Sequence, residues 1–150
     1  MNKYGLIVIV LLFFGCKTLE NYPSNVSITE KNDSFTYTFS GQGFSKKFDD
    51  CQFEAEKNIF EVLMFRGLSG TDLQNPLIDD EILSKEKNKA FYNDFFEKKK
   101  YRNFISSKVE VVDKPKSTKG GFTCSVKFTI NLNSLKTNLE QNGIIRKFGL

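Results

Sequence analysis

The sequence predicts an α+β domain, in which an antiparallel sheet of about four strands carries two or three helices on one face, in the order ββααββα. Apolar and polar residues alternate in paired short runs near both ends of the chain, and this two-residue period is typical of strands that bury one face. Between these runs, apolar residues recur at steps of three and four, which is the period of helices. Strands that are grouped apart from helices indicate an α+β fold rather than a parallel α/β fold.

The first predicted hairpin comprises residues 26–28 and 35–39, which both alternate apolar with polar side chains. Residues 30–34 between them are rich in turn formers. In the second strand we expect Phe35, Tyr37 and Phe39 to point into the core. We expect Gly41 and Gly43 to end this strand at a positive φ or a tight bend.

A helix is predicted over residues 46–65, followed by Gly67 as a C-terminal stop. Asp49 and Asp50 fall in its first turn, where acidic side chains complement the helix dipole. A second apolar row indicates that the helix is covered on two sides. The main apolar stripe consists of Phe48, Cys51, Ala55, Ile59, Val62 and Arg66.

Residues 68–86 predict an irregular acidic loop, and residues 85–100 predict a second helix. The acidic residues of the loop lack the glycine-turn spacing of a calcium loop, so we interpret the loop as solvated surface. The helix ends in Lys98, Lys99 and Lys100, which suit a helix C-terminus. Its four clustered rings are interpreted as core rather than as a ligand platform: Phe91, Tyr92, Phe95 and Phe96.

Two further strands, residues 104–112 and 122–132, are predicted to pair antiparallel across a flexible turn at residues 114–121. The second of them has the most regular alternation in the chain. A last helix is expected to begin with Asn133 or Ser134 as its N-cap and to end at Asn142 and Gly143.

The N-terminus resembles a bacterial lipoprotein signal peptide. Lys3 precedes a ten-residue apolar stretch that ends just before Gly15 and Cys16, and this stretch is too short to span a membrane but suits a signal peptide. We therefore expect residues 1–15 to be removed, Cys16 to carry lipid, residues 16–25 to form a tether and residues 26–150 to form a single domain. In double-membrane bacteria, Lys17 rather than Asp after the lipidated cysteine favours the outer membrane, facing the periplasm, although surface display stays open.

With Cys16 assigned to lipid, Cys51 and Cys124 form an even pair in an oxidising compartment. Such a pair permits a disulfide. Both residues also fall on apolar faces, where two buried free thiols fit equally well. A metal site is not expected, because two thiols without any histidine fall short of a four-ligand set.

Composition argues against several classes of function. The 22 basic and 18 acidic residues give a mild, mixed charge, so no nucleic-acid partner is expected. Histidine is absent from the sequence, which removes the commonest general base. We expect neither an enzyme nor a cofactor. A carboxylate-dependent hydrolase ranks last among the hypotheses and would use Asp49 with Asp50, or Asp79, Asp80 and Glu81.

The chain also resembles small exported lipoproteins related to the N-terminal domain of flagellar assembly protein T. The resemblance rests on the order of short motifs: residues 40–43 with the following helix, residues 101–105, residues 120–122 with the long alternating strand, and residues 132–145. It implies a compact, exported, non-enzymatic scaffold domain and carries no catalytic residues. The family's first helix is usually rich in alanine, whereas here Ala55 is nearly alone.

These observations favour a lipid-anchored interaction or assembly module that binds another envelope protein. The predicted interaction surface is the polar face of the long strand, or the acidic loop. The alternative is a binder of a small molecule or lipid in an aromatic cavity between the sheet and the second helix. The polar face consists of Thr123, Ser125, Lys127 and Thr129.

Overall fold

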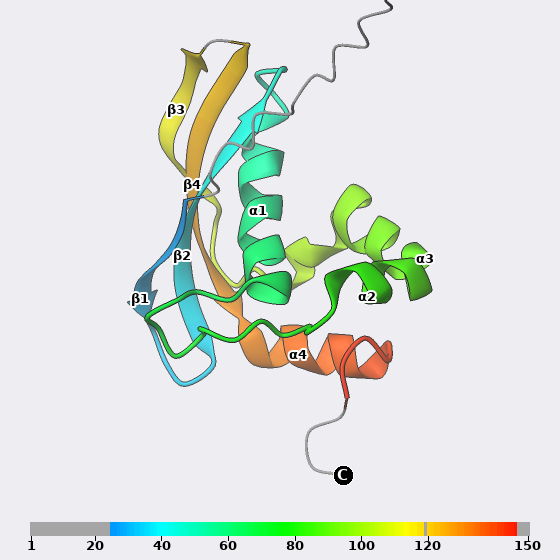
Figure 1. The fold of residues 1–150 in the computed structure, drawn as a ribbon. Helices are drawn as coiled ribbons and strands as arrows, with labels where there is room; N and C mark the ends of the chain where they lie inside the picture. Colours follow the sequence, from blue (N-terminus) through cyan, green and yellow to red (C-terminus); the bar gives the residue numbers. More distant parts are fainter. Residues whose placement is uncertain (1–24, 119, 147–150) are drawn as a thin grey trace, which may run out of the picture.

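The computed structural model describes residues 25–118 and 120–146 (Figure 1). Within them, four strands form one antiparallel sheet in the order β1-β2-β4-β3, which confirms the predicted α+β class. Four α-helices accompany the sheet, rather than two or three. The strands are β1 (Val26–Lys31), β2 (Thr36–Ser45), β3 (Glu110–Thr118) and β4 (Gly121–Asn131). The helices are α1 (Cys51–Phe65), α2 (Glu81–Lys87), α3 (Lys89–Tyr92) and α4 (Leu132–Gln141), with a π-helical turn at Asn93–Glu97 and a 3₁₀ helix at Lys100–Phe104.

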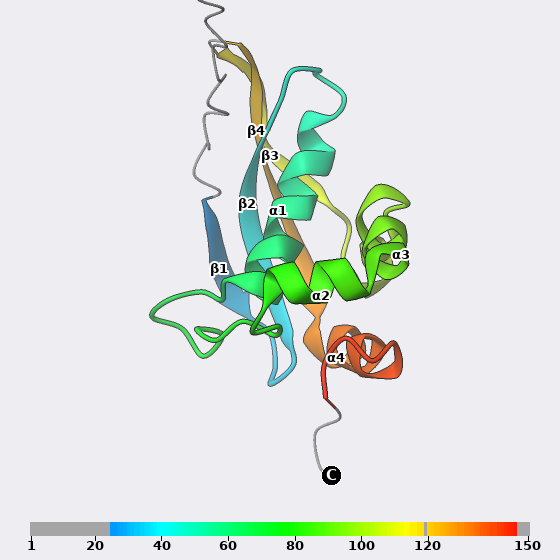
Figure 2. The same cartoon turned by 45° about the vertical axis from the view of Figure 1, so that its right-hand side comes forward.

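The helices lie on one side of the sheet, and α1 runs along its middle strands (Figures 1 and 2). Phe60 of α1 is fully buried, and its ring centroid lies 5.0 Å from that of Tyr101 and 6.1 Å from that of Phe128 in β4. The core is therefore a single aromatic-rich layer that joins β4, α1 and the 3₁₀ helix. No helix in the described part of the chain has the length and apolar character needed to cross a membrane.

Close contact between α1 and β2 depends on two glycines in the middle of the strand. A Cβ on Gly43 would lie 2.3 Å from the backbone nitrogen of Ala55, and one on Gly41 would lie 2.5 Å from the side chain of Ile59. The expectation that Gly41 and Gly43 end the strand at a positive φ is wrong, because β2 continues to Ser45 and neither glycine has a positive φ. Their role is to let the helix backbone approach the strand.

The first and the last of the three predicted helices begin at other residues than expected. Helix α1 begins at Cys51 rather than at residue 46, so Phe48 lies outside it, 55% exposed, with its ring edge-to-face on Phe122. Helix α4 begins earlier than predicted, because the side chain of Asn131 accepts the N-cap hydrogen bond from the backbone of Ser134. Phe35 also differs from expectation, since it precedes β2 and is 56% exposed.

The predicted helix over residues 85–100 is wrong, because the chain forms several short helical segments instead. Asp80 caps α2 by accepting a hydrogen bond from the backbone of Leu83, so that helix begins earlier than expected. Asn88 leaves helical geometry and ends α2. Lys99 then adopts a left-handed conformation with φ 57°, which starts the 3₁₀ helix. These breaks allow Tyr92, Phe95, Phe96 and Tyr101 all to be buried, which one straight surface helix does not permit.

The predicted strand over residues 104–112 lies about six residues too early in the chain, because β3 begins at Glu110. Phe104 belongs to the 3₁₀ helix, and Ile105 makes only an isolated bridge to Ile130. Strand β3 covers residues 110–118, which include most of the segment expected to be a turn. It lies at the edge of the sheet and pairs irregularly with β4 around residues 112–115. An edge position tolerates Pro115, which has no backbone N–H to donate to a neighbouring strand.

Candidate functional site

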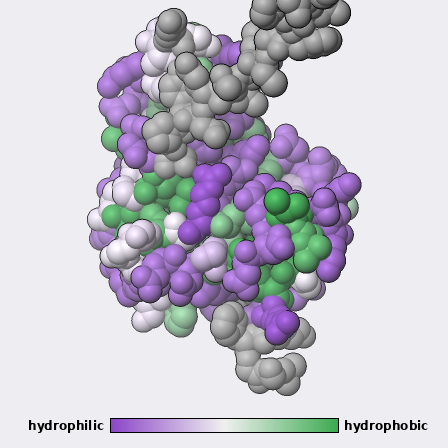
Figure 3. Space-filling model, viewed as in Figure 1, coloured by the Kyte–Doolittle hydropathy of each residue, from purple (hydrophilic) through white to green (hydrophobic). Residues whose placement is uncertain are grey.

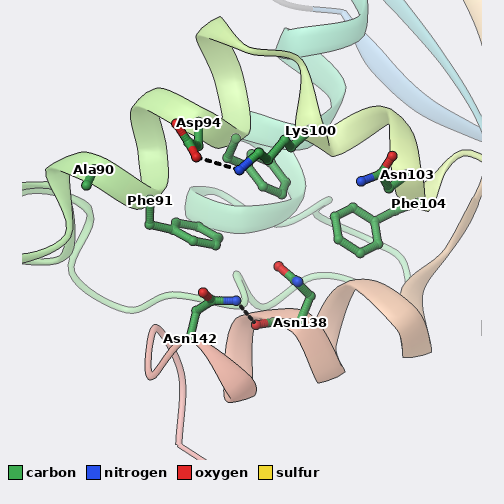
Figure 4. Close-up of a pocket in the computed structure, with 9 residues that line it drawn as sticks. Ala90, Phe91, Asp94, Lys100, Asn103, Phe104, Asn138 and Asn142 are labelled. Atoms are coloured by element: carbon green, nitrogen blue, oxygen red, sulfur yellow. Dashed lines mark hydrogen bonds and ion pairs between the residues drawn. The ribbon is translucent and has the colours of Figure 1, made fainter.

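A pocket of about 340 Å³ lies between α4 and the helical segment 90–104 (Figure 4). One wall comes from α3, the π-helical turn and the 3₁₀ helix, and the other from α4. This volume falls at the lower end of the range for small-molecule sites, roughly 300–1,000 Å³. The lining residues are Ala90, Phe91, Asp94, Phe95, Lys100, Asn103, Phe104, Asn138 and Asn142.

Three phenylalanine rings line the pocket in a row. The ring planes of Phe91 and Phe95 are inclined by 25° at a centroid distance of 5.5 Å, and those of Phe95 and Phe104 by 23° at 5.9 Å. Phe95 is buried, so its position in the core fixes the row. Phe91 is half-buried and offers the most accessible ring. The three rings are therefore stacked on one another with an offset, and Phe91 supplies most of the accessible aromatic surface.

Three asparagine side chains supply the polar part of the lining (Figure 4). Asn142 donates from its side-chain nitrogen to the backbone oxygen of Asn138, at 2.8 Å, which closes the last turn of α4. The side-chain amides of Asn103 and Asn138 have no hydrogen-bond partner in the described part of the chain. A side-chain amide offers both donors and an acceptor. These groups are available to a bound molecule.

An ion pair borders the same pocket. Asp94 accepts hydrogen bonds from Lys100 and from Lys98, the latter at 2.7 Å. These bonds, that of Lys100 first, lower the pKa of the Asp94 carboxyl to about 2. The carboxylate is therefore charged and matched by cations at neutral pH. A carboxyl with so low a pKa is poorly suited to act as a general acid or base at neutral pH.

Local backbone irregularity positions these side chains. Asp94 lies in the π-helical turn, and Lys100 follows Lys99, the only described residue other than glycine with a positive φ. Turns of π-helix occur often at functional sites, and left-handed non-glycine residues persist only where the surroundings hold them. Both irregularities lie within seven residues of one another at the wall of the pocket.

The predicted polar face of β4 lies on the side of the sheet away from the helices. Cys124, Val126, Phe128 and Ile130 are buried on the helix side, so the alternate residues face outward. Thr123, Lys127 and Thr129 are half-buried there, whereas Ser125 is only 7% exposed. The Thr129 hydroxyl also shares a 2.9 Å hydrogen bond with that of Thr38. Part of this face is therefore occupied by contacts within the sheet.

The two domain cysteines lie together, and the structure joins them in a disulfide. Cys51 is the first residue of α1 and Cys124 lies in β4, 73 residues later, with a Cα–Cα distance of 6.0 Å. That distance falls in the usual range for disulfides. Both residues are buried. The bond ties the helix to the sheet at the end where the backbones of α1 and β2 are closest.

Two of the acidic residues considered as catalytic groups, Asp80 and Glu81, have structural contacts. Asp80 caps α2, and Glu81 accepts a 2.6 Å hydrogen bond from Lys85 one turn later. Asp72, another acidic residue of the loop but not one of those candidates, pairs with Lys31 and accepts a hydrogen bond from the hydroxyl of Tyr37. These contacts give no support to the carboxylate-hydrolase hypothesis. The residues of the other pair, Asp49 and Asp50, lie exposed just before α1.

A buried acid that the sequence analysis missed lies at the centre of the fold. Glu56 of α1 is fully buried, and both of its carboxylate oxygens are bonded to Arg102, at 2.7 and 2.9 Å. Tyr101 and Gln52 each donate a further hydrogen bond of 2.9 Å. Burial, and then the negative charge of Glu56, raise the pKa of the Tyr101 hydroxyl. No buried side-chain polar atom of the described residues lacks a partner, so this cluster is saturated and structural.

A wider groove of about 900 Å³ runs between loop 72–80, α2 and the end of α4. Figure 3 shows apolar surface gathered on this side of the molecule, over α2 and the end of the described chain. Ile82 and Leu83 of α2 are 74% and 46% exposed, and Leu83 borders the groove with Ile144 and Ile145. Both acidic and basic residues also line this groove. Its lining therefore indicates no single class of ligand, unlike that of the pocket beside α4.

Sequence reasoning found the aromatic residues but not the pocket. The expected cavity lay between the sheet and the helix, whereas Tyr92, Phe95 and Phe96 fill that space as core. Asn103 and Asn138 lie 35 residues apart and meet only in the folded chain. The sequence signal that was visible is the four-residue spacing of Asp94 and Lys98, which predicts a helical ion pair.

Cys16, Lys17 and the rest of the predicted signal peptide and tether up to residue 24 lie outside the described residues. Lipidation and placement at the outer membrane therefore stay predictions. No protein-family model matches this chain, and neither a curated protein nor a solved structure is significantly similar to it. The resemblance to lipoproteins related to flagellar assembly protein T stays a prediction as well.

Proposed function

We propose that the protein is an exported lipoprotein, anchored through Cys16, that acts without catalysis as an interaction module for another envelope protein. The observation that carries this proposal is the open outer face of the sheet. All described helices lie on the other side (Figures 1 and 2). Thr123, Lys127 and Thr129 keep part of their surface accessible there, and a polar surface of this kind is usual in non-obligate protein interfaces.

Charges from neighbouring strands give this face a pattern that a partner can recognise. Lys127 is paired in register with Glu110 of β3, and Asp113 is paired with Ser125. Lys116 and Asp113 also form an exposed ion pair on β3, at 3.6 Å. Positive and negative groups therefore alternate across the face. Such patterns favour specificity and orientation over raw affinity.

The entry point of the chain fits a short membrane tether. The backbone oxygen of Asn25 accepts a hydrogen bond from Gln42, so the described chain begins beside β2 at the level of α1. Cys16 and Asn25 are nine residues apart, which limits the tether to about 30 Å when fully extended. The domain would therefore act close to the membrane surface. Lys17 favours the outer membrane for that position.

Site-specific photo-crosslinking in living cells tests the interface. A photoreactive amino acid at Lys127 should crosslink one envelope protein in good yield. The matched control is the same group at Lys89, an exposed position of α3 on the helix side, which should not capture that protein. Equal capture from both positions, or none from Lys127, would count against the outer face as the interface.

The anchor is tested separately with Cys16→Ser. The variant should lose acyl labelling and accumulate as an unprocessed precursor. A variant that is still acylated, or that matures normally, would overturn the lipoprotein assignment without bearing on the interface.

A second function, binding of a small ligand, is favoured by one specific observation. The pocket beside α4 combines an aromatic row with two side-chain amides that have no partner in the described part of the chain. Small-molecule sites typically combine an apolar and aromatic lining with a few polar groups of this kind.

A further inference from the structure

We propose that the pocket between segment 90–104 and α4 binds a neutral saccharide of one or two rings. The proposal rests on the second function above and names its ligand class. It is independent of the protein interface on the outer sheet face, because the pocket lies on the helix side of the sheet (Figures 1 and 4).

The aromatic row supplies the apolar half of such a site. A sugar ring has a face of C–H groups surrounded by hydroxyls, and that face packs against flat aromatic surface. Phe91 and Phe104 border the pocket and are connected through Phe95, with inter-ring inclinations of 25° and 23°. Phe95 and Phe104 are anchored in the core. Phe91, the accessible ring, packs against Phe95 and Tyr92, so little conformational entropy is lost when a sugar packs against it.

The asparagines supply the polar half. Each sugar hydroxyl is both a donor and an acceptor, and side-chain amides offer both functions on one planar group. The amides of Asn103 and Asn138 approach the pocket from opposite walls and have no partner in the described part of the chain (Figure 4). Asn142 uses its nitrogen on the backbone of α4. The two amides without a partner among the described residues therefore lie on opposite walls of the pocket, where they can bond hydroxyls at the edge of a sugar ring.

The ion pair favours a neutral ligand. Asp94 is matched by Lys98 and Lys100, so its carboxylate does not present uncompensated negative charge to a cation. Both lysines pair with Asp94. An anion site instead requires cationic side chains that can bond the ligand directly. The pair nevertheless offers hydrogen-bonding atoms to hydroxyls at the rim of the pocket. The volume of about 340 Å³ accommodates one or two sugar rings.

The test is saturation-transfer NMR and calorimetry on the full chain, solubilised in a zwitterionic detergent that has no sugar headgroup. The probes are cellobiose, lactose and N,N′-diacetylchitobiose. At least one should bind with a Kd of 10 mM or lower. Asn138→Ala and Asn103→Ala should each weaken that binding at least fivefold, because each removes an amide that folding does not use. The matched control Thr137→Ala, exposed on α4 and outside the pocket lining, should change it less than twofold.

Two results would overturn the proposal. One is the absence of binding by all three disaccharides to protein that gives a folded circular-dichroism spectrum. The other is binding that both asparagine variants leave unchanged. If lipid extraction instead recovers an apolar molecule whose retention depends on Phe91, the saccharide proposal is wrong and the small-ligand function survives. The crosslinking result from Lys127 decides the protein interface separately.

Discussion

Replacement of Arg102 by methionine tests how the buried acid of α1 is held. The guanidinium makes two charge-assisted hydrogen bonds to Glu56, which is fully buried, while Arg102 itself is 46% exposed. Such bonds contribute about 1.5–3 kcal/mol each. Because water reaches the Arg102 side chain, we take the lower end of this range for each hydrogen bond. Two bonds then contribute about 3 kcal/mol to stability. Breaking a buried ion pair from one side costs a similar amount, about 3–5 kcal/mol.

The assay is urea unfolding of residues 17–150 at pH 7 under non-reducing conditions, followed by far-ultraviolet circular dichroism. Arg102→Met should lower the free energy of unfolding by about 3 kcal/mol. The double variant Glu56→Gln, Arg102→Met should be more stable than the single variant by about 1 kcal/mol or more, because it no longer buries an unpaired charge. Lys116→Met is the matched control, since Lys116 is 73% exposed in its pair with Asp113. It should change stability by about 0.5 kcal/mol or less.

A loss below about 1 kcal/mol for Arg102→Met would mean that water solvates Glu56 well enough without the arginine. A double variant no more stable than the single one would show that packing, rather than charge, sets the cost. Either result would refute the interpretation of this cluster as a buried, saturated ion pair.

Three other predictions concern the disulfide, the helix–strand contact and the pocket ion pair. The variant Cys51→Ala, Cys124→Ala should lose about 4 kcal/mol in the same urea assay, because the bond closes a loop of 73 residues; a loss below about 1 kcal/mol would contradict it. Gly43→Ala should cost about 3 kcal/mol, since its Cβ would lie 2.3 Å from the backbone of α1, and Ser40→Ala on the opposite face of the same strand should be nearly neutral. The depressed pKa of Asp94, about 2, means that its ion pairs stabilise the fold above pH 4 and lose that effect as the pH falls toward 2. The difference in unfolding midpoint between wild type and Asp94→Asn should therefore be full at pH 7 and shrink steadily as the pH falls from 4 to 2, and a constant difference would contradict it.

The strands that bury one complete face were predictable from sequence, and the edge of the sheet was not. In β4 the alternation from Cys124 to Ile130 reflects contact with α1 on one side only, so the periodic signal survives folding. Strand β3 has no such signal, because it is an edge strand with irregular pairing that places Val111 and Val112 at the surface. The sequence pattern predicts that Phe104 begins a strand, whereas it belongs to the 3₁₀ helix. A single apolar residue that a short helical turn buries gives the same sequence pattern as one that begins a strand.

The pocket illustrates a different limit. Its aromatic residues are visible in sequence, but their assignment to the core or to a surface depends on where the helix breaks. Those breaks follow from Asn88 and from the left-handed Lys99, and neither has a sequence signature that distinguishes it from an ordinary surface residue. Asn103 and Asn138 become neighbours only through the packing of α4. Sites assembled from separate elements require the tertiary structure.

The order of the strands has a consequence for how the chain would fold after the export proposed above. The two central strands are far apart in sequence: Thr36 pairs with Asn131, and Ser45 with Phe122, at separations of 95 and 77 residues. Such long-range pairing forms slowly, because a large loop must close first. In a chain that crosses a membrane N-terminus first, β2 emerges long before β4. One edge of β2 is covered by β1, and the other offers unpaired hydrogen-bonding groups to any neighbouring chain until β4 arrives. The edge of β2 that later pairs with β4 is therefore where a chaperone would do most to prevent misassembly.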